Sequence, residues 1–167
     1  VLILPLAIGT LIWIYINSHK MIASNEIVYN EIYAAFGTRT SLKLADSTLV
    51  WLNSGSSLRY PNKFNNKNRQ VFLKGEAYFE VESDISGPFI VRTSTLQVKA
   101  EGTKFNVLEY DSGYETEVTL ITGKVSVEGN IVSKLQFITE LNHGQHLEYN
   151  RLTGGKIITE GDINKYI

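Results

Sequence analysis

From Thr40 onward the chain alternates between apolar and polar residues in short runs, and turn residues separate most runs. A period of two is typical of strands that bury one face, and no segment after Phe36 keeps the 3.6-residue apolar period of a long helix. The predicted strands are 41–44, 48–52, Gln70–Leu73, Ala77–Val81, Phe89–Arg92, Leu96–Ala100, Lys104–Glu109, Glu115–Ile121, Lys124–Val127, Leu135–Ile138, Gln145–Tyr149 and Lys156–Thr159. The pattern therefore predicts an all-β domain over residues 37–160, built as a two-layer β-sandwich or as a solenoid-like double sheet of many short strands.

The segment 75–81 illustrates how the core of this domain is encoded. Side chains alternate along a strand, so Ala77, Phe79 and Val81 share one face, which we expect to be buried. Glu76, Tyr78 and Glu80 share the other face. Two carboxylates on one face could serve a glycosidase, but we favour a solvated sheet face because paired carboxylates with perturbed pKa values are rare.

Residues 1–18 have a different character, because Val1–Ile16 is almost entirely apolar. As a helix this run is roughly 24 Å long, somewhat less than a bilayer core of about 30 Å. Trp13 and Tyr15 stand near its end, where interfacial aromatic residues are common. We expect residues 1–18 to be the C-terminal part of a transmembrane anchor, with a buried core helix or strand as the alternative. Residues 19–36 are then a connector and a first strand, although Ile27–Tyr33 could also form a short helix.

Composition limits the remaining function classes. The 167 residues include 16 Lys and Arg and 17 Asp and Glu, so no basic surface for nucleic acid is expected. The absence of cysteine excludes disulfides, cysteine-ligated metal sites and a thiol nucleophile. We find no catalytic residues and expect the chain not to be an enzyme and to need no cofactor or metal.

Two further segments could carry chemistry. The stretch Asn62–Arg69 is expected to be a long hairpin loop, solvated at its tip or, alternatively, a basic contact patch. His143 and His146 stand close together, but no third ligand lies near them in the sequence, so a metal site there is disfavoured.

An ordered set of motifs between Gly37 and Gly129 resembles the FecR domain of Gram-negative cell-surface signalling proteins. Residues 44–47 and 50–56, LADS and VWLNSGS, are similar to the family's opening L-P-D-G and V-W-L-N-x-x-S. Residues 69–81, RQVFLKGEAYFEV, are similar to its R-x-V-x-L-x-G-E-A-Y-F-E-V. Residues 88–91, 102–107 and 123–127 follow in the family's order. The chain departs from the pattern at Ala45, Ser47, Thr122 and His143, none of which is an expected core position.

The resemblance implies a periplasmic part of an inner-membrane anti-sigma factor. It implies that a signal from a TonB-dependent outer-membrane transporter, for iron or glycan uptake, reaches an extracytoplasmic-function sigma factor through protein–protein contacts. The sigma factor would be bound by a cytoplasmic segment absent from this chain, residues after about 20 would be periplasmic, and 161–167 would link to a further C-terminal domain. A membrane-anchored carbohydrate-binding β-sandwich is the alternative.

Docking of the transporter's signalling domain would use exposed sheet edges or surface tyrosines. An edge offers unpaired backbone donors and acceptors, and tyrosine is enriched at interfaces. Tyr60, Tyr78 and Tyr110 are the candidate partner contacts, although each could instead lie half-buried beside the core.

Overall fold

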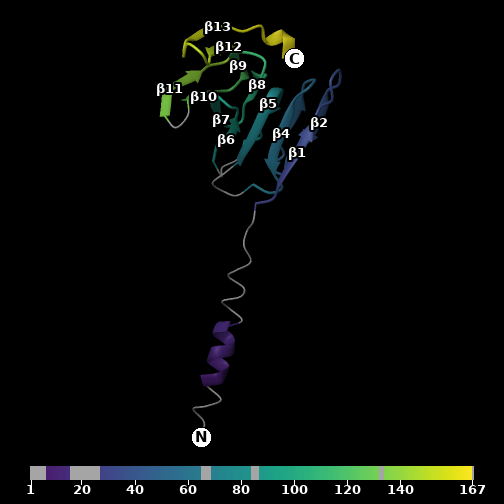
Figure 1. Cartoon of the computed structure of the whole chain (residues 1–167), viewed down its shortest axis with the longest axis vertical. Helices are drawn as coiled ribbons and strands as arrows, with labels where there is room; N and C mark the ends of the chain where they lie inside the picture. Colours follow the sequence, from purple (N-terminus) through teal and green to yellow (C-terminus); the bar gives the residue numbers. More distant parts are fainter. Residues whose placement is uncertain (1–6, 16–26, 65–68, 84–86, 132–133, 167) are drawn as a thin grey trace.

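The computed structural model describes residues 7–15, 27–64, 69–83, 87–131 and 134–166 of the chain. Residues 7–15 form a helix that stands apart from a β domain (Figure 1). The domain contains the strands β1 (Tyr29–Tyr33), β2 (Thr40–Lys43), β3 (Leu49–Leu52), β4 (Ser57–Pro61), β5 (Arg69–Glu80), β6 (Phe89–Arg92), β7 (Leu96–Ala100), β8 (Lys104–Glu109), β9 (Glu115–Thr122), β10 (Val125–Ile131), β11 (Lys134–Leu141), β12 (Gln145–Asn150) and β13 (Lys156–Glu160), followed by the short 3₁₀ helix η1 (Ile163–Tyr166).

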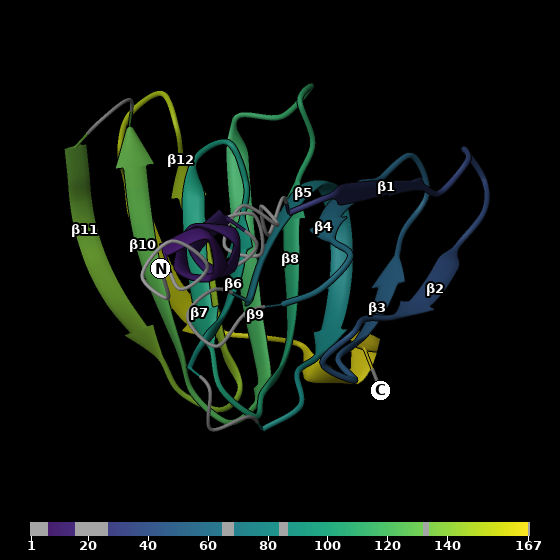
Figure 2. The ribbon, with the colours of Figure 1, turned by 90° about the horizontal axis from the view of Figure 1, so that it is seen from below.

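The strands form one continuous sheet that curls into two facing layers (Figure 2). Sheet A has the order β1-β4-β5-β6-β7-β10-β11, and sheet B has the order β2-β3-β5-β8-β9-β12-β13. Neighbouring strands are antiparallel except for β5 and β6, which are parallel. The prediction of a mostly β domain of short strands is confirmed, but the two layers belong to a single curled sheet.

Strand β5 connects the two layers because its halves pair with different neighbours. Its first half pairs with β4 and β6, ending at Lys74 opposite Ser57, and its second half pairs with β3 and β8, starting at Gly75 opposite Glu109. The prediction of two separate strands here, Gln70–Leu73 and Ala77–Val81, was therefore wrong. The chain turns from one layer to the other within a single strand.

Gly75 makes this change of layer possible. Its φ of +94° lies in the left-handed region that favours glycine. A Cβ at this position would lie 2.4 Å from Ser56 Oγ and 2.9 Å from Ser56 Cα. The same serine hydroxyl accepts a hydrogen bond from the Glu76 N–H at 2.8 Å. Only a residue without a side chain lets β5 bend while passing so close to the β3–β4 turn.

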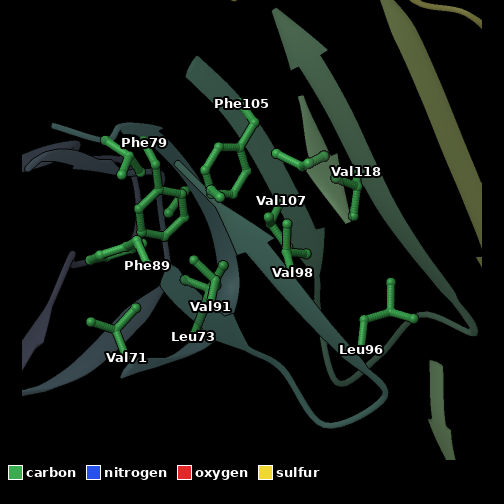
Figure 3. Packing of buried hydrophobic residues seen from close by; sticks show 14 of the residues in the cluster. Val71, Leu73, Phe79, Phe89, Val91, Leu96, Val98, Phe105, Val107 and Val118 are labelled. Carbon is green, nitrogen blue, oxygen red and sulfur yellow. The ribbon is translucent and has the colours of Figure 1, made fainter. Parts of the chain in front are cut away.

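The core lies between the two layers and is filled by inward-facing side chains from both (Figure 3). Ala77, Phe79 and Val81 are buried, as predicted. The ring of Phe79 stacks on Phe105 of the same layer at 5.2 Å and packs against Phe89 of the opposite layer at 6.0 Å. Burying an aromatic side chain of this size contributes about 3–5 kcal/mol as judged by truncation to alanine.

The N-terminal expectations have a mixed outcome. Ile27–Tyr33 contains strand β1, so the strand interpretation is right and the short helix is wrong. Residues 7–15 are helical, but no helix among the described residues has the length and apolar content needed to cross a bilayer. Half of residues 1–18, and the connector up to residue 26, lie outside the described residues, so the anchor stays a prediction.

The predicted loop Asn62–Arg69 also needs a correction. It does join two antiparallel strands, but Arg69 is the first residue of β5 and is only 1% exposed. Its guanidinium donates to the carbonyls of Gly87 and Glu82 and pairs with Asp46 at 3.3 Å. Arg69 is therefore neither part of a basic patch nor solvated. Residues 65–68 of the loop lie outside the described residues.

Candidate functional site

The three predicted contact tyrosines do not form one surface. Tyr60, on β4, is half-buried and packs against the hydrophobic core. Tyr110 follows β8, and its hydroxyl donates to the Ser54 carbonyl at 2.9 Å, which ties this loop to the β3–β4 turn. Tyr78 alone lies on the outer face of sheet B beside an exposed aromatic side chain. The geometry thus favours structural roles for Tyr60 and Tyr110.

A row of aligned residues crosses the outer face of sheet B at Tyr78. The strand register places Trp51 opposite Tyr78 and Tyr78 opposite Asn106, on β3, β5 and β8. The rings of Trp51 and Tyr78 are 5.4 Å apart, and Trp51 is 37% exposed. The two rings, inclined at 51° to each other, form an aromatic platform on this face.

Glu76 organises the polar groups next to this platform. Its two carboxylate oxygens accept hydrogen bonds from the side-chain amides of Asn53, at 2.6 Å, and Asn106, at 3.0 Å. The Asn53 amide oxygen in turn accepts a hydrogen bond from Arg39 Nε at 3.4 Å. These contacts hold two amides and the Glu76 carboxylate in fixed orientations, so Glu76 belongs to a structural hydrogen-bond network.

These residues line a groove of about 490 Å³, which we call the outer groove. Its lining includes Trp51 and Tyr78, the polar residues Asn53, Glu76 and Asn106, and the basic residues Arg39 and Lys165. Lys165 comes from η1, which Figure 2 shows at the yellow end of the chain near β3. The groove thus brings together residues from the N-terminal and C-terminal parts of the domain's sequence.

The Tyr78 hydroxyl is held in its neutral form. Partial burial, and secondarily the charge of Glu80 and the hydrogen bond to it at 3.2 Å, raise the pKa of Tyr78 to about 12. Glu80 also pairs with Lys104 at 3.1 Å. At neutral pH Tyr78 therefore remains a hydrogen-bond donor and is not a candidate general base.

The two histidines have local partners rather than a shared ligand. His143 Nδ1 lies within hydrogen-bond distance of the Ile121 carbonyl. His146 Nδ1 lies 2.8 Å from Thr119 Oγ1, and its Nε2 lies 3.5 Å from a Glu148 oxygen. In the part of the chain that the structure describes, no group of three or more His, Cys, Asp or Glu residues could hold a metal ion.

Comparison with known proteins shows to which family the chain belongs. The sequence model of the family described as FecR protein matches residues 30–126, which is more than half of the chain. The chain belongs to the FecR family. The matched range begins in β1 and ends in β10, so it contains the bend at Gly75 and the groove residues Trp51, Tyr78 and Asn106.

Two solved structures are similar to this FecR chain, and both are described as crystal structures of a putative anti-sigma factor from Parabacteroides distasonis ATCC 8503. The first has a TM-score of 0.77 and 33% identity, with 83% of this chain covered. The second has a TM-score of 0.75 and 34% identity, with 81% covered. The match spans 62% of the length of each solved chain. No curated protein matches this FecR chain.

The FecR motif residues have structural roles that explain their spacing. Asp46, in the first motif, pairs with Arg69 at the start of the second, and its carboxylate also accepts hydrogen bonds from the Thr48 N–H and hydroxyl. Ser47, where the family motif has glycine, has a φ of +73°. The turn therefore keeps the left-handed geometry that glycine would supply, in spite of the substitution.

Glu109 is a structural residue of the FecR domain that the sequence pattern did not reveal. Burial acts to raise its pKa, but hydrogen bonds from Ser94, Thr93, Thr95 and Thr116 outweigh this effect and lower the pKa below its usual value. Thr95 donates at 2.6 Å and Thr116 at 2.9 Å. The hydroxyl donors come from the β6–β7 turn of sheet A and from β9 of sheet B, so the carboxylate joins the two layers.

Proposed function

We propose that this FecR domain is the periplasmic part of an inner-membrane anti-sigma factor. In this proposal it relays the state of a TonB-dependent outer-membrane transporter to an extracytoplasmic-function sigma factor by protein–protein contact. The observation that carries the proposal is the family match over residues 30–126, together with the two anti-sigma-factor neighbours that are 33% and 34% identical. The family's role is regulatory, which supports binding rather than catalysis.

The N-terminal helix supports attachment to a membrane. Its large apolar side chains, Ile8, Leu11, Ile12, Trp13 and Ile14, are each at least 50% exposed. An apolar helix with side chains as exposed as these favours an apolar environment, which a bilayer supplies. In this arrangement residues 1–18 belong to a membrane span, and the β domain lies in the periplasm.

The edge strand β13 is the docking site that we favour for the transporter's signalling domain. All five of its residues are exposed, and sheet B ends at this strand. Ile157 and Ile158 are 60% and 41% exposed, so a partner strand would cover apolar side chains as well as backbone groups. Strand addition to such an edge satisfies the unpaired donors and acceptors of both partners.

The register of β13 identifies which of its groups face the open edge. The Asn150 N–H donates to the Gly155 carbonyl at 2.9 Å, and the Gly161 N–H donates to the Gly144 carbonyl at 2.7 Å. The pairs Gly144–Gly161 and Asn150–Gly155 are therefore hydrogen-bonded, and such pairs alternate with non-hydrogen-bonded pairs along an antiparallel ladder. By this alternation the pair Leu147–Ile158 is not hydrogen-bonded, so the backbone N–H and C=O of Ile158 point away from β12. Proline at this position would remove an outward donor without breaking the ladder to β12.

The test measures binding of purified signalling domains from the TonB-dependent transporters of the source organism to the chain. We expect one domain to bind, with affinity lost in Ile158→Pro and largely kept in Ile158→Ala, which removes the side chain alone. Binding that survives Ile158→Pro would exclude β13 as the docking edge.

Deletion of the gene in the source organism tests the regulatory role separately. We expect transcription from the promoters of one extracytoplasmic-function sigma factor to change. Unchanged transcription from every such promoter, together with no binding by any signalling domain, would refute the proposed relay.

A further inference from the structure

The outer groove has properties that docking at β13 does not use. Trp51, which is 37% exposed, lines the groove, and the centroid of the Tyr78 ring lies 5.4 Å from that of Trp51. The volume of about 490 Å³ lies within the range of small-molecule sites, roughly 300–1,000 Å³. Two aromatic rings, inclined at 51° to each other, and a set of oriented polar groups therefore line one groove.

The charges around the groove balance each other. Two basic residues, Arg39 and Lys165, and two acidic residues, Glu76 and Glu80, line it. Lys104, which pairs with Glu80 at 3.1 Å, is not among the lining residues. A surface with no excess of either sign does not attract an anion or a cation over a neutral molecule.

The polar groups of the groove are fixed in direction before any ligand arrives. Glu76 accepts from the amides of Asn53 and Asn106, and Arg39 donates to Asn53. Each side chain thus has one donor or acceptor already engaged, which orients those that remain. Preorganised groups of this kind lose little further side-chain entropy when a ligand binds.

We propose that the outer groove binds a neutral pyranose unit of a glycan. A pyranose ring has an apolar face of C–H groups, which can stack on the indole of Trp51. Its rim of hydroxyls both donates and accepts, which matches the mixture of amide, carboxylate and guanidinium groups beside the platform. The ligand is uncharged, in agreement with the balanced lining.

A protein partner is the other class of ligand that an exposed tryptophan can bind. The groove favours the sugar because its recognition groups lie within one small recess, whereas a protein interface extends over about 800 Å² on each partner. Binding at the groove is independent of the signalling function proposed above, so either can fail without the other.

The test uses the intrinsic fluorescence of Trp51. The chain contains two tryptophans, Trp13 and Trp51, so the variant Trp13→Phe leaves Trp51 as the single reporter. The protein is kept in a detergent without a sugar headgroup and is titrated with maltohexaose, xylohexaose, mannohexaose or cellohexaose. The titrations extend to about 10 mM, which covers weak sites with dissociation constants near 1 mM.

We expect a saturable change in Trp51 emission with at least one of these oligosaccharides. Isothermal titration calorimetry of the same sugar should show affinity weakened about tenfold or more in Trp51→Ala, since aromatic anchors dominate binding sites. Tyr114→Ala is the matched control, because Tyr114 is also an exposed aromatic residue, at 58%, but lies outside the groove.

Two results would overturn the proposal. The first is the absence of a saturable response to all four sugars. The second is sugar binding that Trp51→Ala leaves unchanged, which would place the site elsewhere. If instead Trp51→Ala abolishes capture of a transporter signalling domain while no sugar binds, the groove is a protein interface and the glycan assignment is wrong.

Discussion

Substituting Gly75 with alanine tests the bend that joins the two layers. Two separate effects destabilise the variant. A φ of +94° costs a residue with a Cβ about 1–2 kcal/mol. The new methyl group would also lie 2.8 Å from Ser56 Cβ and 2.9 Å from Ser56 Cα, so the β3–β4 turn has to shift, which costs about 1–3 kcal/mol more. We therefore expect a loss of about 2–5 kcal/mol in the free energy of unfolding.

Gly37→Ala is the matched control. Gly37 has a similar φ of +78°, but a Cβ there would meet no atom within 4 Å. This variant therefore has the backbone strain without the collision, and its expected loss is about 1–2 kcal/mol. Both substitutions restrict the unfolded chain equally, so that contribution cancels in the comparison.

Urea denaturation followed by far-ultraviolet circular dichroism measures both variants. The midpoint of Gly75→Ala should fall below that of Gly37→Ala, with an unchanged slope if the unfolded state is the same. Equal losses in the two variants would show that the contact with Ser56 does not constrain the bend. A loss for Gly75→Ala below about 0.5 kcal/mol would refute the argument as a whole.

Three further changes test the buried polar groups and the groove. Arg69→Ala should lower the free energy of unfolding by about 3–5 kcal/mol, because it leaves Asp46 buried without its ion-pair partner; a loss under about 1 kcal/mol in urea denaturation would contradict this. Glu109→Gln should destabilise the domain by about 1–3 kcal/mol at neutral pH. Because folding lowers the pKa of Glu109, this stabilisation is present above the ordinary pKa of 4.5 and is lost as the pH falls through the folded pKa. The free energies of unfolding of wild type and variant, plotted against pH, should therefore converge in acid. Curves that stay parallel would exclude the carboxylate as the cause. Tyr78→Phe should remove a phenolate absorbance step near pH 12, and loss of a step near pH 10 instead would show that burial and Glu80 do not act on this hydroxyl.

Strands with regular alternation could be predicted closely from the sequence. Phe89–Arg92, Leu96–Ala100 and Lys104–Glu109 have the predicted bounds. In Leu96–Ala100 apolar residues stand at every second position and define both the strand and its buried face. The sequence pattern predicts two strands in place of the long strand β5, because a glycine within a run indicates a break as readily as a bend. The sequence pattern does not show that the strand continues through Gly75 with a change of neighbours.

Buried polar residues and the groove depended on contacts that are distant in the sequence. Arg69 stands next to a polar loop, and its partners Asp46, Glu82 and Gly87 come from other segments. The groove requires Trp51 and Asn106 to meet at Tyr78, and this follows from the register of three strands. Local periodicity carries no information about register between strands so far apart, and only the tyrosine was predicted as a contact.

The shared strand β5 also determines how a mechanical load would travel through the domain. The N-terminal strand β1 belongs to sheet A, and the C-terminal strand β13 belongs to sheet B. Tension applied between the ends of the domain therefore crosses the β1–β4 and β4–β5 ladders, passes along the β5 backbone and leaves through the ladders of sheet B. Each of these ladders would bear the whole load in turn, so the domain would open at its weakest ladder, and β5 would carry the load from one layer to the other.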